Sequence, residues 1–97
     1  MTGQVFGVLS PLTLVRVQAE AMRAHLKHGD RSLLNPDMDQ MLKLAALMEE
    51  VGEVAHEMTY DVVPERDRLV RELLQVASVA PSWVESLECP AARSVSP

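Results

Sequence analysis

The apolar residues of this chain recur with the period of a helix, and prolines mark where the predicted helices begin. Proline is tolerated in the first helical turn, because the backbone N–H that it lacks would have no partner there. Pro11, directly after a capping serine, predicts a first helix over residues 12–28, which Gly29 would end in a left-handed conformation. Pro36 predicts a second and longer helix over residues 36–59.

The third predicted helix begins at Pro64, and its end is ambiguous. Glu65 and Asp67 lie in its first turn, where negative charge is favoured by the helix dipole. Pro81 removes a backbone hydrogen bond. It therefore either kinks this helix or separates it from a short fourth segment over residues 82–87.

The fold class follows from these elements, because no alternating polar and apolar pattern persists beyond the first ten residues. The chain is predicted to be all-α, with residues 1–88 forming one antiparallel bundle of three to four helices and residues 89–97 a disordered tail. A lone domain of 97 residues buries only about 60–65% of its unfolded surface. Oligomerisation, as a homodimer or homotetramer, is therefore expected to complete the core.

Charge and cysteine content narrow the possible partners. The 14 Asp and Glu against 9 Lys and Arg give a net charge of −5, which argues against nucleic acid as a partner and suits binding of divalent cations. The single cysteine, Cys89, excludes an internal disulfide and a cysteine-rich zinc site, which favours a reducing compartment and hence the cytoplasm. No apolar run approaches the roughly 18 residues that span a bilayer, so no membrane partner is expected.

On a helical wheel, the second predicted helix has an apolar side bordered by a stripe of carboxylates. The apolar side is expected to face the core and contains Met41, Leu44, Leu47, Met48, Val51, Val54, Ala55 and Met58. Its methionines would fill the core or an interface, because this side chain adapts to irregular gaps. The stripe consists of Glu49, Glu50, Glu53 and Glu57. By itself, such a stripe is also typical of a solvated helix face.

A carboxylate on the third predicted helix lies on the apolar side of that helix. Glu72 falls between Val76 and Val79 on the wheel. Burying an unpaired charge is costly, so Glu72 must be paired, protonated or bound to a metal ion. Gln75 follows one turn later at the edge of the same apolar arc.

The loop between these two helices predicts which residues face each other. If the hairpin turns between residues 62 and 63, residues n and 125 − n lie level, so that Glu53 faces Glu72 and Glu50 faces Gln75. Two carboxylates about 6 Å apart repel by roughly 3 kcal/mol at an effective dielectric constant near 20. A cation would remove this penalty, and ligands that offer only oxygen select a hard ion such as Mg²⁺ or Mn²⁺.

These residues also form a recognisable motif. The segment that starts at Glu49 has the form EExxE, and after 18 intervening residues it is followed by ELLQVA, which starts at Glu72. The pattern resembles the MazG-like all-α nucleoside triphosphate pyrophosphohydrolases, whose signature is EExxE followed by ExxD. The likeness covers residues 42–87 and includes a Trp-containing segment after ELLQVA. The resemblance implies Mg²⁺-dependent cleavage of an NTP or dNTP between its α and β phosphates, which yields a monophosphate and pyrophosphate.

The resemblance further implies roles for individual residues. Glu50, Glu53 and Glu72 would be metal ligands, and Gln75 would occupy the remaining ligand position of the motif. Glu49 would be the catalytic residue, which positions the attacking water or helps to bind a further metal ion. Gln75 departs from the signature, which has aspartate at this position. Because a neutral amide offers an oxygen but no charge, weaker metal binding, fewer ions and lost catalysis all stay open.

Two basic residues near the carboxylates are candidate ligands of the substrate. Lys43 lies two turns before Glu50 on the same stripe, and Arg71 adjoins Glu72. Either one contacts a phosphate group or is an ordinary surface residue. The polar segment 27–31 likewise either reaches a nucleotide or forms a simple turn. Two alternatives to an active hydrolase are therefore a catalytically weak nucleotide-binding relative and a non-enzymatic helical dimer with a solvated acidic face.

Overall fold

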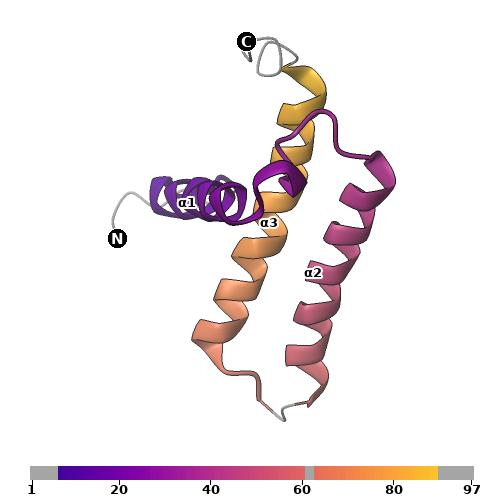
Figure 1. Ribbon diagram of the computed structural model, residues 1–97. Coiled ribbons are helices and arrows are strands. Elements are labelled where there is room, and N and C mark those ends of the chain that lie inside the picture. The colour runs from indigo at the N-terminus through magenta and orange to yellow at the C-terminus, as the bar shows by residue number, and fades with distance from the viewer. Residues whose placement is uncertain (1–6, 61–62, 90–97) are drawn as a thin grey trace.

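The computed structural model describes residues 7–60 and 63–89, and it is all-helical within them. Its elements are α1 (Pro11–His28), the short 3₁₀ helix η1 (Gly29–Arg31), α2 (Gln40–Tyr60) and α3 (Arg66–Glu88). α2 and α3 form an antiparallel hairpin, and α1 crosses α3 at a steep angle (Figure 1). The predicted all-α fold is therefore confirmed. Residues 90–97 of the predicted tail lie outside the described residues, and none of the described helices has the length and hydropathy needed to cross a bilayer.

The boundaries of α1 agree with the prediction. The Ser10 hydroxyl accepts a hydrogen bond from the backbone N–H of Thr13 at 3.2 Å, which satisfies one of the free donors of the first turn. Pro11 occupies the first helical position. Gly29 ends the helix with φ of +58°, a conformation that favours glycine.

The predicted start of α2 is wrong by four residues. Asn35 accepts a hydrogen bond from the N–H of Asp37 through its side chain and another from the N–H of Met38 through its carbonyl, so Pro36 lies in a turn and not in the helix. Asp39 caps the helix, because its carboxylate accepts from the N–H of Met41 at 2.8 Å. A short polar side chain before a proline is compatible with both structures, and the tertiary course of the chain decides between them.

α3 continues without a break through Pro81, so the fourth segment that proline allowed does not exist as a separate helix. At the start of α3, the carboxylate of Glu65 accepts hydrogen bonds from the N–H groups of Asp67 and Arg68. Pro81 and Ala77 are both exposed, so water can satisfy the carbonyl that loses its helical partner. The chain thus contains three α-helices among the described residues.

The predicted core face of α2 is wrong within the single chain. Met41 and Met48 from that face are 69% and 60% exposed. α2 instead turns Lys43, Glu50 and Glu57, which recur every seven residues, toward α3, and these side chains are buried or half-buried. A wheel identifies an apolar side, but it does not identify the molecule that covers that side. Only one apolar residue, Val79, is fully buried among those that the structure describes.

Candidate metal centre

Three glutamates from two helices converge at the middle of the hairpin. Glu50 and Glu53 lie one turn apart on α2, and Glu72 lies opposite on α3. One carboxylate oxygen from each of the three lies within 4.8 Å of the other two. Such a separation leaves room for a common cation, because Mg²⁺ and Mn²⁺ bind carboxylate oxygens at a little over 2 Å.

The facing pairs confirm the predicted register of the hairpin. Glu50 lies at hydrogen-bonding distance from Gln75, and a carboxylate oxygen of Glu53 lies within 4.8 Å of one of Glu72. One turn further toward the loop, the carboxylate of Glu57 lies 3.6 Å from the guanidinium of Arg68. All three pairs follow the relation between n and 125 − n.

Gln75 acts as a hydrogen-bond donor toward the carboxylates. With its amide nitrogen facing them, it donates to Glu50 Oε2 at 2.8 Å and to Glu72 Oε2 at 3.3 Å. This orientation turns the amide oxygen away from the glutamate oxygens. Gln75 therefore bridges two of the three carboxylates as a donor, whereas the sequence motif led us to expect an oxygen ligand.

Desolvation and, after it, the repulsion between neighbouring carboxylates raise the pKa of two carboxyl groups in the cluster. Desolvation raises the pKa of Glu50, and the negative charges of Glu53 and Glu72 raise it further. Desolvation also raises the pKa of Glu72, followed by its hydrogen bond with Glu53 and the charges of Glu53 and Glu57, while Arg71 opposes the shift. These shifts show that the ionised cluster is short of positive charge.

Glu57 lies one turn beyond the cluster, toward the loop, and faces Arg68. Its Oε1 is buried and has no hydrogen-bond partner among the described residues, and its ion pair with Arg68 is long. A buried acceptor without a donor is uncommon and calls for an explanation. For the cluster itself, the all-oxygen donor set of Glu50, Glu53 and Glu72 is of the kind that suits a hard divalent ion.

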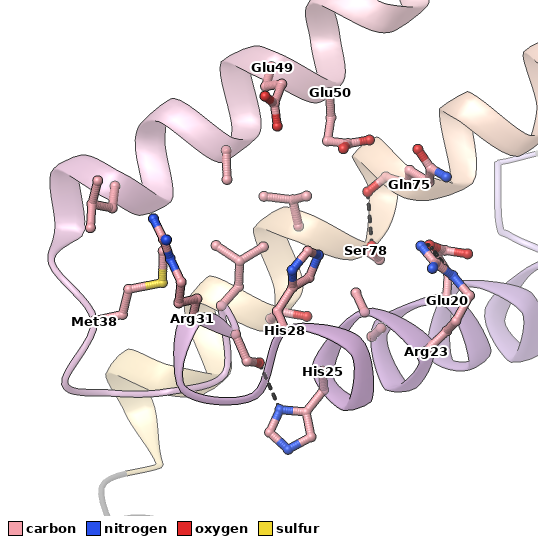
Figure 2. A pocket seen from close by; sticks show the side chains of 18 of the residues that line it. Glu20, Arg23, His25, His28, Arg31, Met38, Glu49, Glu50, Gln75 and Ser78 are labelled. Carbon is pink, nitrogen blue, oxygen red and sulfur yellow. Dashed lines mark hydrogen bonds and ion pairs between the residues drawn. The ribbon is translucent and has the colours of Figure 1, made fainter.

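A cavity of about 420 Å³ opens next to the carboxylates, between α1, η1 and the hairpin. Glu49 and Glu50 project into it from α2, while His28 and Arg31 approach from the opposite wall (Figure 2). Arg23 lies on α1 beside Gln75 and is paired with Glu20. The cavity is thus acidic on the hairpin side and carries basic groups on the side of α1 and η1.

The two basic residues proposed from sequence lie elsewhere. Lys43 is completely buried and donates a hydrogen bond from Nζ to the Ser86 hydroxyl at 2.6 Å, so in this structure it does not border the cavity. Burial lowers the pKa of Lys43. Arg71 is exposed and borders a smaller hollow of about 250 Å³ near Arg16 and Leu74. Their predicted contact with substrate has no support from this geometry.

The sequence did not predict two of the charged residues that line the cavity, and it left the role of a third open. Glu20 and Arg23 form an i,i+3 pair of a kind that occurs on many solvated helices, so no local signal marks them as part of a site. Arg31 belongs to the polar segment for which a nucleotide contact and a simple turn were both open. All three reach the site because α1 packs across α3, which the periodicity of α1 does not specify.

Comparisons with protein-family models, with curated proteins and with solved structures find no match for this chain. The resemblance to the MazG-like hydrolases therefore stands on the motif alone. The geometry of the site is the independent ground for a functional proposal.

Proposed function

We propose that this chain is a Mg²⁺-dependent nucleoside triphosphate pyrophosphohydrolase of the cytoplasm, which cleaves NTP or dNTP to the monophosphate and pyrophosphate. The observation that carries the proposal is the convergence of Glu50, Glu53 and Glu72, of which Glu50 lines a cavity with basic groups on its far wall. At about 420 Å³, the cavity falls in the usual range for small-molecule sites. A polyphosphate would lie between the carboxylates and the basic wall.

Each wall of the cavity has a distinct task in this proposal. Glu50, Glu53 and Glu72 would hold Mg²⁺, or Mn²⁺ in its place. When bound, the ion supplies charge neutralisation on the phosphoryl oxygens and lowers the pKa of water. Glu49 is exposed to the cavity, where its carboxylate accepts the proton of the attacking water. Arg31 neutralises phosphate charge on the opposite wall.

A pyrophosphate-release assay tests the activity. Wild-type protein is offered a panel of NTPs and dNTPs with Mg²⁺ or Mn²⁺, and metal-dependent release of pyrophosphate is expected. Glu72→Gln should lose turnover, because it removes one of three carboxylates, whereas the matched variant Glu88→Gln at the exposed end of α3 should retain it. Unchanged turnover in Glu72→Gln would contradict the proposed role of Glu72 as a metal ligand.

The basic wall has its own test. Arg31→Gln should raise KM about tenfold or more with a smaller change in kcat, since it removes a charge that contacts bound phosphate in both the ground state and the transition state. Arg66→Gln is the matched control, because Arg66 is exposed and outside the cavity. An equal effect of both substitutions on KM would argue against a phosphate contact at Arg31.

The neutral Gln75 favours a second candidate, a nucleotide-binding relative with weak catalysis. Three ligand carboxylates give less charge for metal binding than the four that the family signature supplies with aspartate at the position of Gln75. In this case, calorimetry detects nucleotide binding while pyrophosphate release stays near background. Gln75→Asp should then increase metal affinity and turnover, because it restores the missing charge, and it should lower the stability of the metal-free protein. If Gln75→Asp binds metal no more tightly than wild type, position 75 is not a ligand position.

The third candidate is a non-enzymatic assembly of two or more copies, as a homodimer or homotetramer. The many exposed apolar side chains of the helices favour assembly in any case. Absence of both metal binding and nucleotide binding would leave assembly as the remaining function.

A further inference from the structure

A second hollow, of about 250 Å³, lies between α1 and the first turns of α3. Arg16 borders it from α1, and the residues that border it from α3 are Arg66, Asp67, Val70, Arg71 and Leu74. It shares no lining residue with the larger cavity beside the glutamate cluster. The proposed hydrolase activity therefore leaves this hollow without a role.

The lining of the hollow is basic, although the protein as a whole is acidic. Three arginines and one aspartate border it, whereas the chain has 14 acidic against 9 basic residues. Val70 and Leu74 are half-buried and supply the apolar part of the lining. Apolar surroundings lower the local dielectric constant and so strengthen the attraction between a guanidinium group and an anion. The hollow accordingly favours a negatively charged ligand.

Arg16 has no ion-pair partner among the residues that the structure describes. Glu20 lies one turn further along α1, at a spacing that allows an ion pair. The Glu20 carboxylate pairs with Arg23 instead and borders the larger cavity. The guanidinium group of Arg16 is therefore exposed at the hollow with its hydrogen-bond donors available.

Arg71 is likewise outside every ion pair of residues 7–60 and 63–89. Asp67 lies one turn before it on α3, but the Asp67 carboxylate is 3.5 Å from the guanidinium group of Arg66. Glu72 follows Arg71 directly and senses its charge, while the Glu72 carboxylate belongs to the glutamate cluster. Two guanidinium groups from two helices thus border one hollow without a carboxylate bound to either.

The donors and the size of the hollow select a class of anion. A guanidinium group presents its N–H donors in a planar fork that matches two oxygens of a phosphoryl group. Two such forks on different helices suit an anion that has two phosphoryl groups. The hollow is smaller than the roughly 300–1,000 Å³ of pockets for drug-sized molecules, which favours an inorganic ligand over a nucleotide.

We propose that this hollow binds inorganic pyrophosphate, with one phosphoryl group at Arg16 and the other at Arg71. The guanidinium groups supply the neutralising charge, so the site needs no metal ion. Arg66 stays paired with Asp67 and makes no contact with the ligand. Pyrophosphate is also the expected product of the proposed hydrolase, but the inference does not rest on that activity, because the site lies outside the larger cavity.

Isothermal titration calorimetry of the full chain with pyrophosphate in EDTA tests the proposal. EDTA removes divalent ions, so neither metal-dependent binding at the glutamates nor hydrolysis contributes to the signal. Binding of one pyrophosphate per chain is expected at low ionic strength. Arg16→Gln and Arg71→Gln should each weaken this binding about tenfold or more, because each removes a charge-assisted contact with a phosphoryl group.

Arg68→Gln is the matched control for these variants. Arg68 is exposed on α3 but does not border the hollow, so its loss should change the affinity by less than about twofold. An equal effect of Arg68→Gln and Arg71→Gln would mean that the net charge of the protein, and not the hollow, attracts the anion. If Arg31→Gln abolishes binding and Arg16→Gln does not, pyrophosphate occupies the larger cavity and the proposal is wrong.

Two further titrations separate the possible results. Inorganic phosphate should bind at least about tenfold more weakly than pyrophosphate, because a single phosphoryl group loses one of the two guanidinium contacts. Equal affinities would contradict the pairing of Arg16 with Arg71. Absence of pyrophosphate binding by the wild type overturns the proposal, whereas failure of the hydrolase proposal shows separately as absence of metal-dependent pyrophosphate release.

Chemical modification locates the ligand in the unaltered protein. Phenylglyoxal reacts with exposed arginines, and Arg16, Arg68 and Arg71 are all exposed. Pyrophosphate in EDTA should slow the modification of Arg16 and Arg71 severalfold and leave the rate at Arg68 unchanged. Mass spectrometry of the digested protein measures the three rates. Equal protection of all three arginines, or of none, would contradict the proposed site.

Discussion

Among the single residues of this protein, Lys43 has the environment that the sequence predicted least. Its ammonium group is completely buried, bonds to the Ser86 hydroxyl, and makes no ion pair with the carboxylates of residues 7–60 and 63–89. Burial of an unpaired charge opposes folding, and it lowers the pKa of this lysine. The position is thus a structural weakness at neutral pH.

Lys43→Met should stabilise the protein by about 1–2 kcal/mol at pH 7, because the thioether keeps the packing of the stem and removes the buried charge. The gain should shrink as the pH rises toward 10.5, since the folded wild type releases the Lys43 proton before the unfolded chain does and so gains stability with pH. Urea unfolding at pH 7 and pH 9.5 measures both effects. A destabilised Lys43→Met at pH 7 would contradict this account.

The carboxylate cluster predicts the opposite dependence on pH. The pKa values of Glu50 and Glu72 are raised above 4.5, so the folded protein binds protons more tightly than the unfolded chain. The stabilising effect of these protons is complete below pH 4.5 and is lost as the pH rises through the raised pKa values. In EDTA, the loss of this contribution should therefore lower the melting temperature of the protein as the pH rises above 4.5.

Metal ions and one substitution test that dependence. Mn²⁺ or Mg²⁺ should restore the melting temperature at pH 7.5, because the ion binds the ionised carboxylates of the folded state only. Glu72→Gln should raise the metal-free melting temperature at pH 7.5 and weaken the response to metal, whereas Glu88→Gln should do neither. A melting temperature that is indifferent to metal at millimolar concentration would exclude a folded-state site.

At the scale of whole elements, local signals predicted the limits of α1 and, to within two residues, the start of α3, but they misplaced the start of α2 and did not predict which way the helices face. Ser10, Gly29 and Glu65 set the limits of α1 and the start of α3 through hydrogen bonds within a few residues, and such signals are readable in the sequence. The facing of Glu50 with Gln75 was predictable as well, because a short hairpin connection fixes the register. The surroundings of the apolar side of α2 were not predictable, since they depend on which other parts of the molecule pack against α2 and not on the local sequence.

The start of α2 offers a prediction at this scale. Asp39→Ala should destabilise the protein by about 1 kcal/mol, because it removes the acceptor of the Met41 N–H at the first turn. Asp30→Ala likewise replaces an exposed aspartate, in η1, with alanine and should destabilise the protein less. Thermal unfolding of the two variants side by side measures the difference. Equal destabilisation would argue that Asp39 does not cap the helix.

For the molecule as a whole, folding and assembly are expected to be one transition. The described chain buries a single apolar residue completely, while apolar rows on both helices of the hairpin stay exposed. A domain of 97 residues with so little core is expected to need contacts between copies for further apolar burial. The sequence already indicated this need through its length, whereas the exposed apolar residues of α2 and α3 became visible only in the structure.

Linked folding and assembly make the melting temperature depend on protein concentration. A hundredfold dilution changes the free energy of unfolding of a dimer by about 2.7 kcal/mol, which corresponds to a fall in melting temperature of about 5–10 °C for two chains of this size. Calorimetry or circular dichroism at 1 and 100 μM measures the shift. Val15→Glu should show the same dependence on concentration as the wild type, because Val15 lies on α1 and not among the exposed apolar residues of α2 and α3. A melting temperature that stays constant over this range would mean that the single chain holds its own core, and the exposed rows on α2 and α3 would then need another explanation.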